Sequence, residues 1–160
     1  MADIHEGFKA TDYRTHPIRA AQYWLVELLR ANVAKVQKRV YPPGITQNAQ
    51  MPRVTVASLS PTEKRWIGEN GASGTRSRFT IHNFKIDCWS KVPQEVDEVA
   101  DQVGEAIFRN RAYKPSDLTK GEFMDMRFQG GSETTFNSAH QIYQRTINIE
   151  AWWHSKGTPY

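Results

Sequence analysis

The sequence predicts an α+β domain in which two amphipathic helices pack on one face of a mostly antiparallel, four-stranded sheet. Two segments carry apolar residues at three- and four-residue steps, which is the spacing of one helical face. Four other segments alternate apolar with polar residues or are rich in β-branched and aromatic side chains, as strands are. Because the order is helix, strand, strand, helix, strand, strand, both helices can bury their stripes against one sheet.

The 160 residues are enough for one domain with its own core, which we expect at residues 15–154. Residues 1–14 lack apolar periodicity and are expected to form an N-terminal arm, and residues 155–160 are expected to form a C-terminal tail. The sequence has no long apolar run and does not open with the basic and apolar regions of a secretory signal. We therefore expect no membrane partner.

The first helix is expected from Ile18 to Val40, where aliphatic residues recur on one helical face. Pro17 fits its opening turn, and the segment Tyr41-Pro42-Pro43-Gly44 should end it, because a residue before proline is pushed out of helical geometry. The second helix has Pro93 in its first turn and an apolar stripe that runs from Val96 to Ile107.

Strands are expected at residues 54–59, 78–89, 123–129 and 143–153. In the second of these, the apolar positions change phase near His82 and Asn83, which predicts a bulge or two unequal halves. Two long polar loops, at residues 60–77 and 130–141, are rich in Gly, Ser, Thr and Asn. Loops of this length often bind partners. We expect both to be mobile in a free subunit and ordered against neighbours.

The two expected helices differ in charge. Between residues 14 and 39 there are six basic residues and one acid, whereas residues 92–107 contain five acids and no basic residue. Complementary patches on one subunit can form a contact between neighbours. The candidate interface residues are Arg30, Lys35, Lys38, Glu95, Asp97, Glu98 and Asp101. For the acidic helix, a solvated face is the commoner explanation, and a divalent-cation site at Asp97 and Asp101 is a further alternative.

Trp152 and Trp153 are adjacent in the last expected strand, so their side chains should point to opposite faces of the sheet. One of the two must then leave the core side. An exposed tryptophan is often an interface anchor, which makes both residues candidates for subunit or partner contact. A role without any partner is equally open.

Cys88 and His82 are the natural candidates for a nucleophile and its base. Six residues along one strand would separate their Cα atoms by roughly 20 Å, which is far beyond hydrogen-bond reach. A buried structural cysteine is therefore the better interpretation. The five histidines are scattered, and the glycine-rich segment 68–74 lacks the Gly-Lys-Ser/Thr of a phosphate loop. We expect no cofactor, no metal and no enzymatic activity.

Several segments together resemble a known family. They are Pro42-Pro43-Gly44 after a basic helix, Met51-Pro52-Arg53-Val54-Thr55-Val56, Phe84-Lys85-Ile86-Asp87-Cys88-Trp89-Ser90-Lys91, Val96-x-x-Val99-Ala100-x-x-Val103, and Ile142-Tyr143-Gln144-Arg145-Thr146-Ile147-Asn148-Ile149 after a Gly-rich turn. In this order they resemble the tail terminator and tail completion (head–tail joining) proteins of siphophages. The resemblance spans about residues 18–153.

The resemblance implies a structural virion protein made in the host cytoplasm. Such a subunit forms a homo-oligomer, expected to be a hexameric ring in the neck of the particle. The ring stops growth of the tail tube by capping the major tail tube protein and offers a docking surface to the head–tail connector or stopper. DNA would pass through its lumen with transient, non-specific contacts, for which Arg76 and Arg78 are the candidates.

Two other classes of protein compete with this interpretation. A small basic nucleic-acid-binding α+β module would use the basic helix, Arg76, Arg78 and Lys85 to contact phosphates. An enzyme built around Cys88 is the third possibility.

Overall fold

The computed structural model describes residues 17–42, 50–59, 62–64, 69–70, 75–76, 78–115 and 121–155. The expected arm at residues 1–14 lies outside the described residues, as does the expected tail apart from Ser155. The elements, in order, are α2 (Pro17–Asn32), the 3₁₀ turn η2 (Ala34–Val36), β1 (Val40–Tyr41), β2 (Arg53–Ser58), β3 (Thr62–Lys64), β4 (Glu69–Asn70), β5 (Thr75–Arg76), β6 (Arg78–Ser90), α3 (Pro93–Arg109), β7 (Glu122–Gly131), β8 (Thr135–Asn137) and β9 (Ile142–Ser155).

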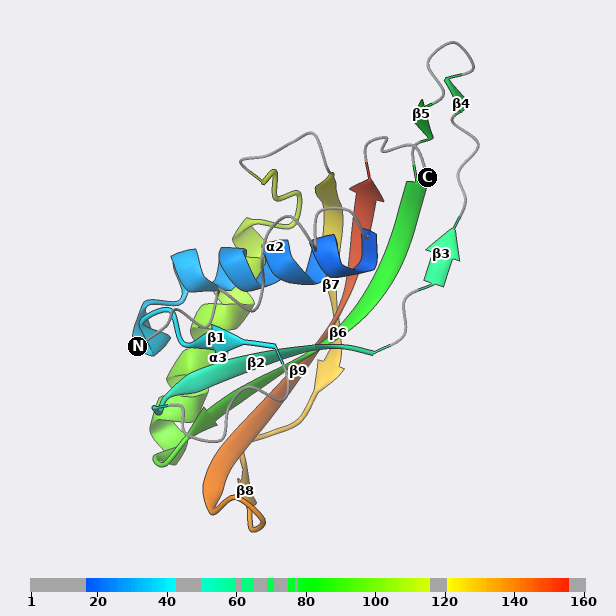
Figure 1. The fold of residues 1–160 in the computed structure, drawn as a ribbon. Helices are drawn as coiled ribbons and strands as arrows, with labels where there is room; N and C mark the ends of the chain where they lie inside the picture. Colours follow the sequence, from blue (N-terminus) through cyan, green and yellow to red (C-terminus); the bar gives the residue numbers. More distant parts are fainter. Residues whose placement is uncertain are drawn as a thin grey trace.

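The α+β class and the mostly antiparallel sheet are confirmed (Figure 1). Within the described residues, the main sheet has seven strands rather than four: its path is β1-β2-β6-β9-β7, with β3 added beside β6 and β8 beside β9. Only the β1–β2 pair is parallel there. The strands that sequence patterns missed are two or three residues long, too short to show an alternation. The short pair β4–β5 forms a separate sheet.

Of the two expectations for His82 and Asn83, the bulge is wrong, but one edge of β6 is divided there into two unequal parts: β2 pairs with residues 84–89 and β3 with residues 79–81. Strands β6 and β9 pair in unbroken antiparallel register from Arg78 opposite Ser155 to Ser90 opposite Tyr143. The apolar phase changes because polar side chains take the core positions at that end of β6: His82 is buried and its Nε2 lies 2.8 Å from Thr80 Oγ1. Register shifts occur instead in β7, between Phe123 and Asp125 and between Phe128 and Gly130.

The first helix ends eight residues earlier than expected, at Asn32 rather than Val40. The amide of Asn32 caps the helix by donating to the Leu28 carbonyl (2.8 Å), and η2 follows. Left-handed backbone at Gln37 and Lys38 then turns the chain into β1. The periodicity persisted in the sequence because Val33, Val36 and Val40 remain fully buried without belonging to the helix.

One hydrophobic core joins α2, α3 and one face of the sheet. Register places its strand members side by side, with Val56 opposite Ile86 and Phe84 opposite Ile149. From α3 the core receives Val96, Val99, Ala100, Val103, Ala106 and Ile107, which are the residues of the expected stripe. The other face of the sheet therefore carries the alternate residues of the same strands.

Candidate assembly surface

The open face, as we call the sheet face that α2 and α3 do not cover, is largely polar. Cross-strand pairing aligns Thr55, Asp87 and Thr146 across β2, β6 and β9. Next to them, Trp89 lies opposite Gln144. Side chains on one sheet face at directly opposite positions lie about 5 Å apart, within reach of direct hydrogen bonds. The open face is thus a continuous surface built by three strands.

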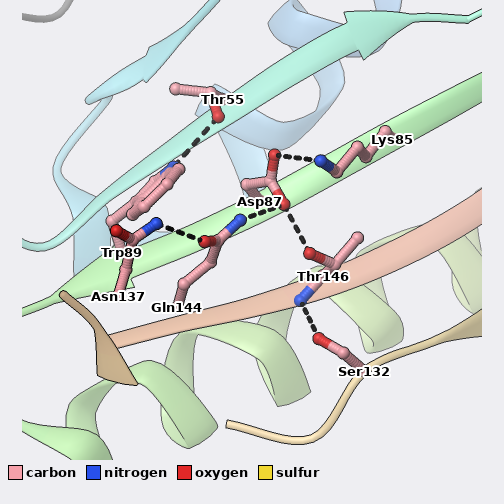
Figure 2. Close-up of polar contacts among 8 residues, drawn as sticks. All are labelled: Thr55, Lys85, Asp87, Trp89, Ser132, Asn137, Gln144 and Thr146. Atoms are coloured by element: carbon pink, nitrogen blue, oxygen red, sulfur yellow. Dashed lines mark hydrogen bonds and ion pairs between the residues drawn. The ribbon is translucent and has the colours of Figure 1, made fainter. Parts of the chain in front are cut away.

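Asp87 is the centre of this surface (Figure 2). One carboxylate oxygen accepts hydrogen bonds from Gln144 Nε2 at 2.9 Å and Thr146 Oγ1 at 2.6 Å, and Lys85 Nζ lies 3.7 Å from the other. These neighbours leave Asp87 only 7% exposed, although no described helix lies above it. Buried carboxylates need such partners, because desolvating an unpaired charge is costly. The network therefore fixes the side chains that the open face presents.

Flanking contacts extend the network toward both sheet edges (Figure 2). Asn137 of β8 donates to Gln144 Oε1 at 3.1 Å, and Trp89 Nε1 donates to Thr55 Oγ1 at 3.0 Å. The Arg53 guanidinium lies over the Trp89 ring, 5.8 Å from its centroid. The open face is consequently an ordered polar platform.

The adjacent tryptophans take opposite roles. Trp153 is fully buried and packs edge-on against Phe123, with ring centroids 4.8 Å apart. A core side chain without exposed surface cannot anchor a partner, so Trp153 does not fit the interface role expected for it. Trp152 points to the open face, where its Nε1 donates to Glu150 Oε1 at 2.7 Å and Arg127 lies over its ring. Trp152 remains a candidate interface residue.

The basic interface candidates from the first expected helix are partly used within the subunit. Arg30 donates to the Val40 carbonyl through Nε (3.0 Å) and Nη2 (2.7 Å) and lies over the Tyr41 ring. Lys35 Nζ lies 2.9 Å from Glu98 Oε2, a contact that raises the lysine pKa through hydrogen bonding and charge. Lys38 is exposed. The side chains of Arg76 and Arg78 lie outside the described residues.

The acidic candidates on α3 also have partners in the same chain. Asp97 accepts from Thr134 Oγ1 and from Arg145 Nη1, the latter at 3.2 Å. Glu95 accepts from Ser90 Oγ at 3.1 Å, and Glu98 pairs with Lys35 as described. Asp101 is exposed. Opposite charge thus joins α3 to the rest of its own subunit, a pairing that only the fold reveals.

Exposed apolar side chains form a feature that the sequence reasoning missed. Those of α3 and the neighbouring β-strands are Val92, Phe108, Met124, Phe128 and Phe136, and Leu59 lies exposed after β2. Phe108 could have been noticed, because it interrupts the polar side of the α3 stripe. Exposed aromatic residues mark partner surfaces when they cluster.

Cys88 is a buried free cysteine, as expected. Burial, reinforced by the charge of Asp87, raises the pKa of its thiol to about 12, although Arg145 lowers it somewhat. Burial lowers the pKa of His82 to about 4, so this imidazole is neutral at physiological pH. The reactive form of a cysteine is the thiolate. Cys88 is therefore held in its unreactive form.

The described part of the chain contains neither a cluster suited to a metal ion nor a helix suited to crossing a membrane. In that part, no three His, Cys, Asp or Glu side chains are grouped so that they could hold a metal ion. Within the same ranges, none of the helices has both the length and the apolar character to cross a membrane.

The comparisons with known proteins bear on the fold. No family model matches the chain, and no curated protein matches it. Among solved structures, a chain from the virion of a native gene transfer agent (GTA) particle superposes with a TM-score of 0.57 and 14% sequence identity. The match covers 83% of this chain and 92% of that one. At this identity the match establishes a shared fold.

Proposed function

We propose that this protein is a structural subunit of a phage-like virion, and specifically the tail terminator that caps the tail tube and joins it to the head connector. The observation that carries the proposal is the fold shared with a GTA virion chain over most of both chains. The sequence patterns that resemble siphophage tail terminators support it independently, because they lie in the amino-acid sequence itself.

In this role the subunit forms a hexameric ring in the neck of the particle. One side of the ring binds the major tail tube protein and the other binds the connector or stopper. The open face, with Trp152 and the network around Asp87, is a surface suited to such a contact: its side chains are fixed before binding, which lowers the entropy lost on association. The proposed role requires no catalytic group, and the buried thiol of Cys88 fits it.

DNA passes through such a ring without being gripped. Two basic residues of the first expected helix that a nucleic-acid module would use are occupied, Arg30 by a backbone carbonyl and Lys35 by Glu98. Weak DNA binding through Arg76 and Arg78 would be indifferent to sequence. The logarithm of its affinity would fall with the logarithm of the salt concentration, with a slope of about 0.9 per phosphate contact. Tight binding to one duplex at high salt would instead favour the nucleic-acid module.

Negative-stain images and light scattering of the purified full chain test the proposal, each with and without assembled tail tubes. We expect closed six-fold rings, alone or at tube ends, and tubes that stop growing when the protein is added. A protein that stays monomeric and leaves tube length unchanged would contradict the proposed function. Cys88→Ala should assemble as the wild type does. An enzymatic activity that is present in the wild type and lost in this variant, with assembly unchanged, would point to an enzyme.

A further inference from the structure

One exposed apolar patch lies at the C-terminal end of α3. Phe108 is 61% exposed, and Phe128 of β7 is 48% exposed. The Phe128 ring lies beside Gly104: the ring atom Cζ of Phe128 would be 4.0 Å from a Cβ placed on that glycine. Gly104 is one helical turn before Phe108, so both rings border the same part of α3. We call this surface, with Arg109 and Arg111, the α3-end patch.

The α3-end patch is basic. The Arg111 guanidinium lies over the Phe108 ring, 4.8 Å from its centroid, and Arg109 pairs with Glu105 on the helix surface at 2.5 Å. Lys114, also exposed, follows shortly after. An aromatic ring with stacked and neighbouring cations favours a partner that combines apolar surface with negative charge.

A second exposed apolar patch lies at the N-terminal end of the same helix. Ser90, Tyr143 and Phe136 lie side by side across β6, β9 and β8. Phe136 is 55% exposed and packs against Tyr143 with ring centroids 5.3 Å apart. Val92, at the N-cap of α3, is 48% exposed. We call this surface, with the exposed Glu133, the α3-start patch.

The α3-start patch has a small net negative charge. Glu133 follows β7, and Glu95 and Asp97 lie in the first turns of α3, whereas Lys91 is exposed beside Val92 and Arg145 pairs with Asp97. The two patches therefore have matching apolar character and net charges of opposite sign. A helix of 17 residues is about 25 Å long, so the two patches of one molecule cannot reach each other. Any contact between them must join two molecules.

We infer that the α3-end patch of one copy binds the α3-start patch of the next, so that the chain assembles head to tail through α3. The inference rests on the proposed ring and names its interface. A contact between two different patches of one protein is heterologous and closes into a ring when the rotation between copies permits it. The exposed phenylalanines supply apolar area, and Arg111 of one copy faces Glu133 of the next.

A two-fold dimer could also bring each patch onto the other, by laying two α3 helices antiparallel. That arrangement would bring the middle of α3 against the middle of the partner's α3. The carboxylates there, including those of Asp101 and Glu105, would face the same residues of the partner. Like charges brought together across an interface are unfavourable. Head-to-tail contact avoids this approach, because only the ends of α3 meet.

Engineered disulfides test the contact directly. Arg111→Cys and Glu133→Cys are introduced together in the full chain, and the buried Cys88 does not compete for surface oxidation. Under mild oxidation we expect a ladder of covalent oligomers that ends at the ring. A matched pair with one cysteine moved, Leu59→Cys with Glu133→Cys, should give no ladder.

Subunit mixing tests the polarity. Phe108→Asp and Phe136→Asp each disable one patch at an exposed position, and each should weaken self-association by at least about 10-fold. Mixed together, the two variants retain one intact contact and should form a heterodimer and nothing larger. Leu59→Asp, equally apolar and exposed but outside both patches, is the control and should assemble normally.

The outcomes separate the inference from the proposed function. Rings that persist in Phe108→Asp and Phe136→Asp, with no disulfide ladder, would overturn the α3 contact and leave the ring proposal standing. Wild-type protein that stops at a dimer would overturn head-to-tail assembly. Protein that is monomeric at every concentration, and also on tail tubes, would overturn both.

Discussion

The two faces of the sheet are built by the same strands and differ in almost everything else. On the helix side, β6 and β9 contribute Phe84, Ile86, Ile149 and Trp153, all essentially without exposed surface. On the open face the intervening residues form hydrogen bonds around Asp87. Successive side chains of each strand point to opposite faces of the sheet, so one strand can serve both. The helix-side residues stabilise the fold by non-directional apolar burial, and the open-face residues form directional hydrogen bonds that fix a surface.

The division is not strict, because His82 and Thr80 occupy core positions on the helix side. His82 stacks on Phe84, with ring centroids 5.6 Å apart, and its Nδ1 is among the buried atoms without a hydrogen-bond partner. The open face shows the opposite exception, since Asp87 is nearly as inaccessible as a core residue. His82 and Asp87 can therefore be used to measure how different the two environments are.

The adjacent tryptophans give the largest expected difference between the faces. Trp153→Ala removes a fully buried ring that packs on Phe123 and should lower the free energy of unfolding by about 3–5 kcal/mol. Trp152→Ala removes a hydrogen bond to Glu150 and the stacked Arg127, and should cost about 1–2 kcal/mol. Urea titration measures both. Similar losses in the two variants would mean that the faces do not differ in burial as described.

The buried histidine gives the next effect, as a dependence of stability on pH. Burial lowers the pKa of His82 from 6.5 to about 4, so the unfolded chain takes up a proton in this pH range while the folded protein does not. The stability that comes from this neutral imidazole is present above pH 6.5 and falls by about 3 kcal/mol as the pH drops to about 4.

Thermal or urea unfolding of His82→Gln between pH 7 and pH 4 measures this contribution. The variant should lose about 3 kcal/mol less than the wild type over that range. A parallel pH dependence in His82→Gln and wild type would show that His82 is not held neutral by burial.

The Asp87 network gives the smallest of the three effects. Asp87→Ala deprives Gln144 and Thr146 of their acceptor and should cost about 1–3 kcal/mol, while Thr146→Val should cost about 1 kcal/mol. A double-mutant cycle measures the coupling between Asp87 and Thr146, which we expect to be at least about 0.5 kcal/mol because the two groups touch. Additive losses would show that the hydrogen bond contributes nothing of its own.

Local patterns in the sequence carried much of the fold. The stripe of α3 and the alternation of β9 each reflect burial of one face, and that burial leaves its own period in the sequence. The same signal misplaced the end of the first helix, because Val33, Val36 and Val40 keep a helical spacing while a 3₁₀ turn and a strand carry them. A period reports which residues are buried and does not by itself report the backbone that buries them.

The candidate surface was less accessible to sequence reasoning, because its parts meet only in three dimensions. The segregated charges predicted contacts between subunits, yet Lys35 and Glu98 are 63 positions apart in sequence and 2.9 Å apart in space. The Asp87 network likewise joins residues of different strands through their register. Sequence could place Trp152 and Trp153 on opposite faces, but which of them enters the core depends on the pairing with β6 and β7.

The unbroken pairing of β6 with β9 gives the molecule a stiff axis. At about 3.3 Å per residue, the 13 residues of β6 span roughly 40 Å. A pull along the strands, applied at opposite ends of the two, loads their hydrogen bonds in shear, so the bonds must yield together rather than one after another. Because β8 pairs with β9 at one end of this axis, a force on the β8–β9 hairpin is transmitted along the paired strands β6 and β9.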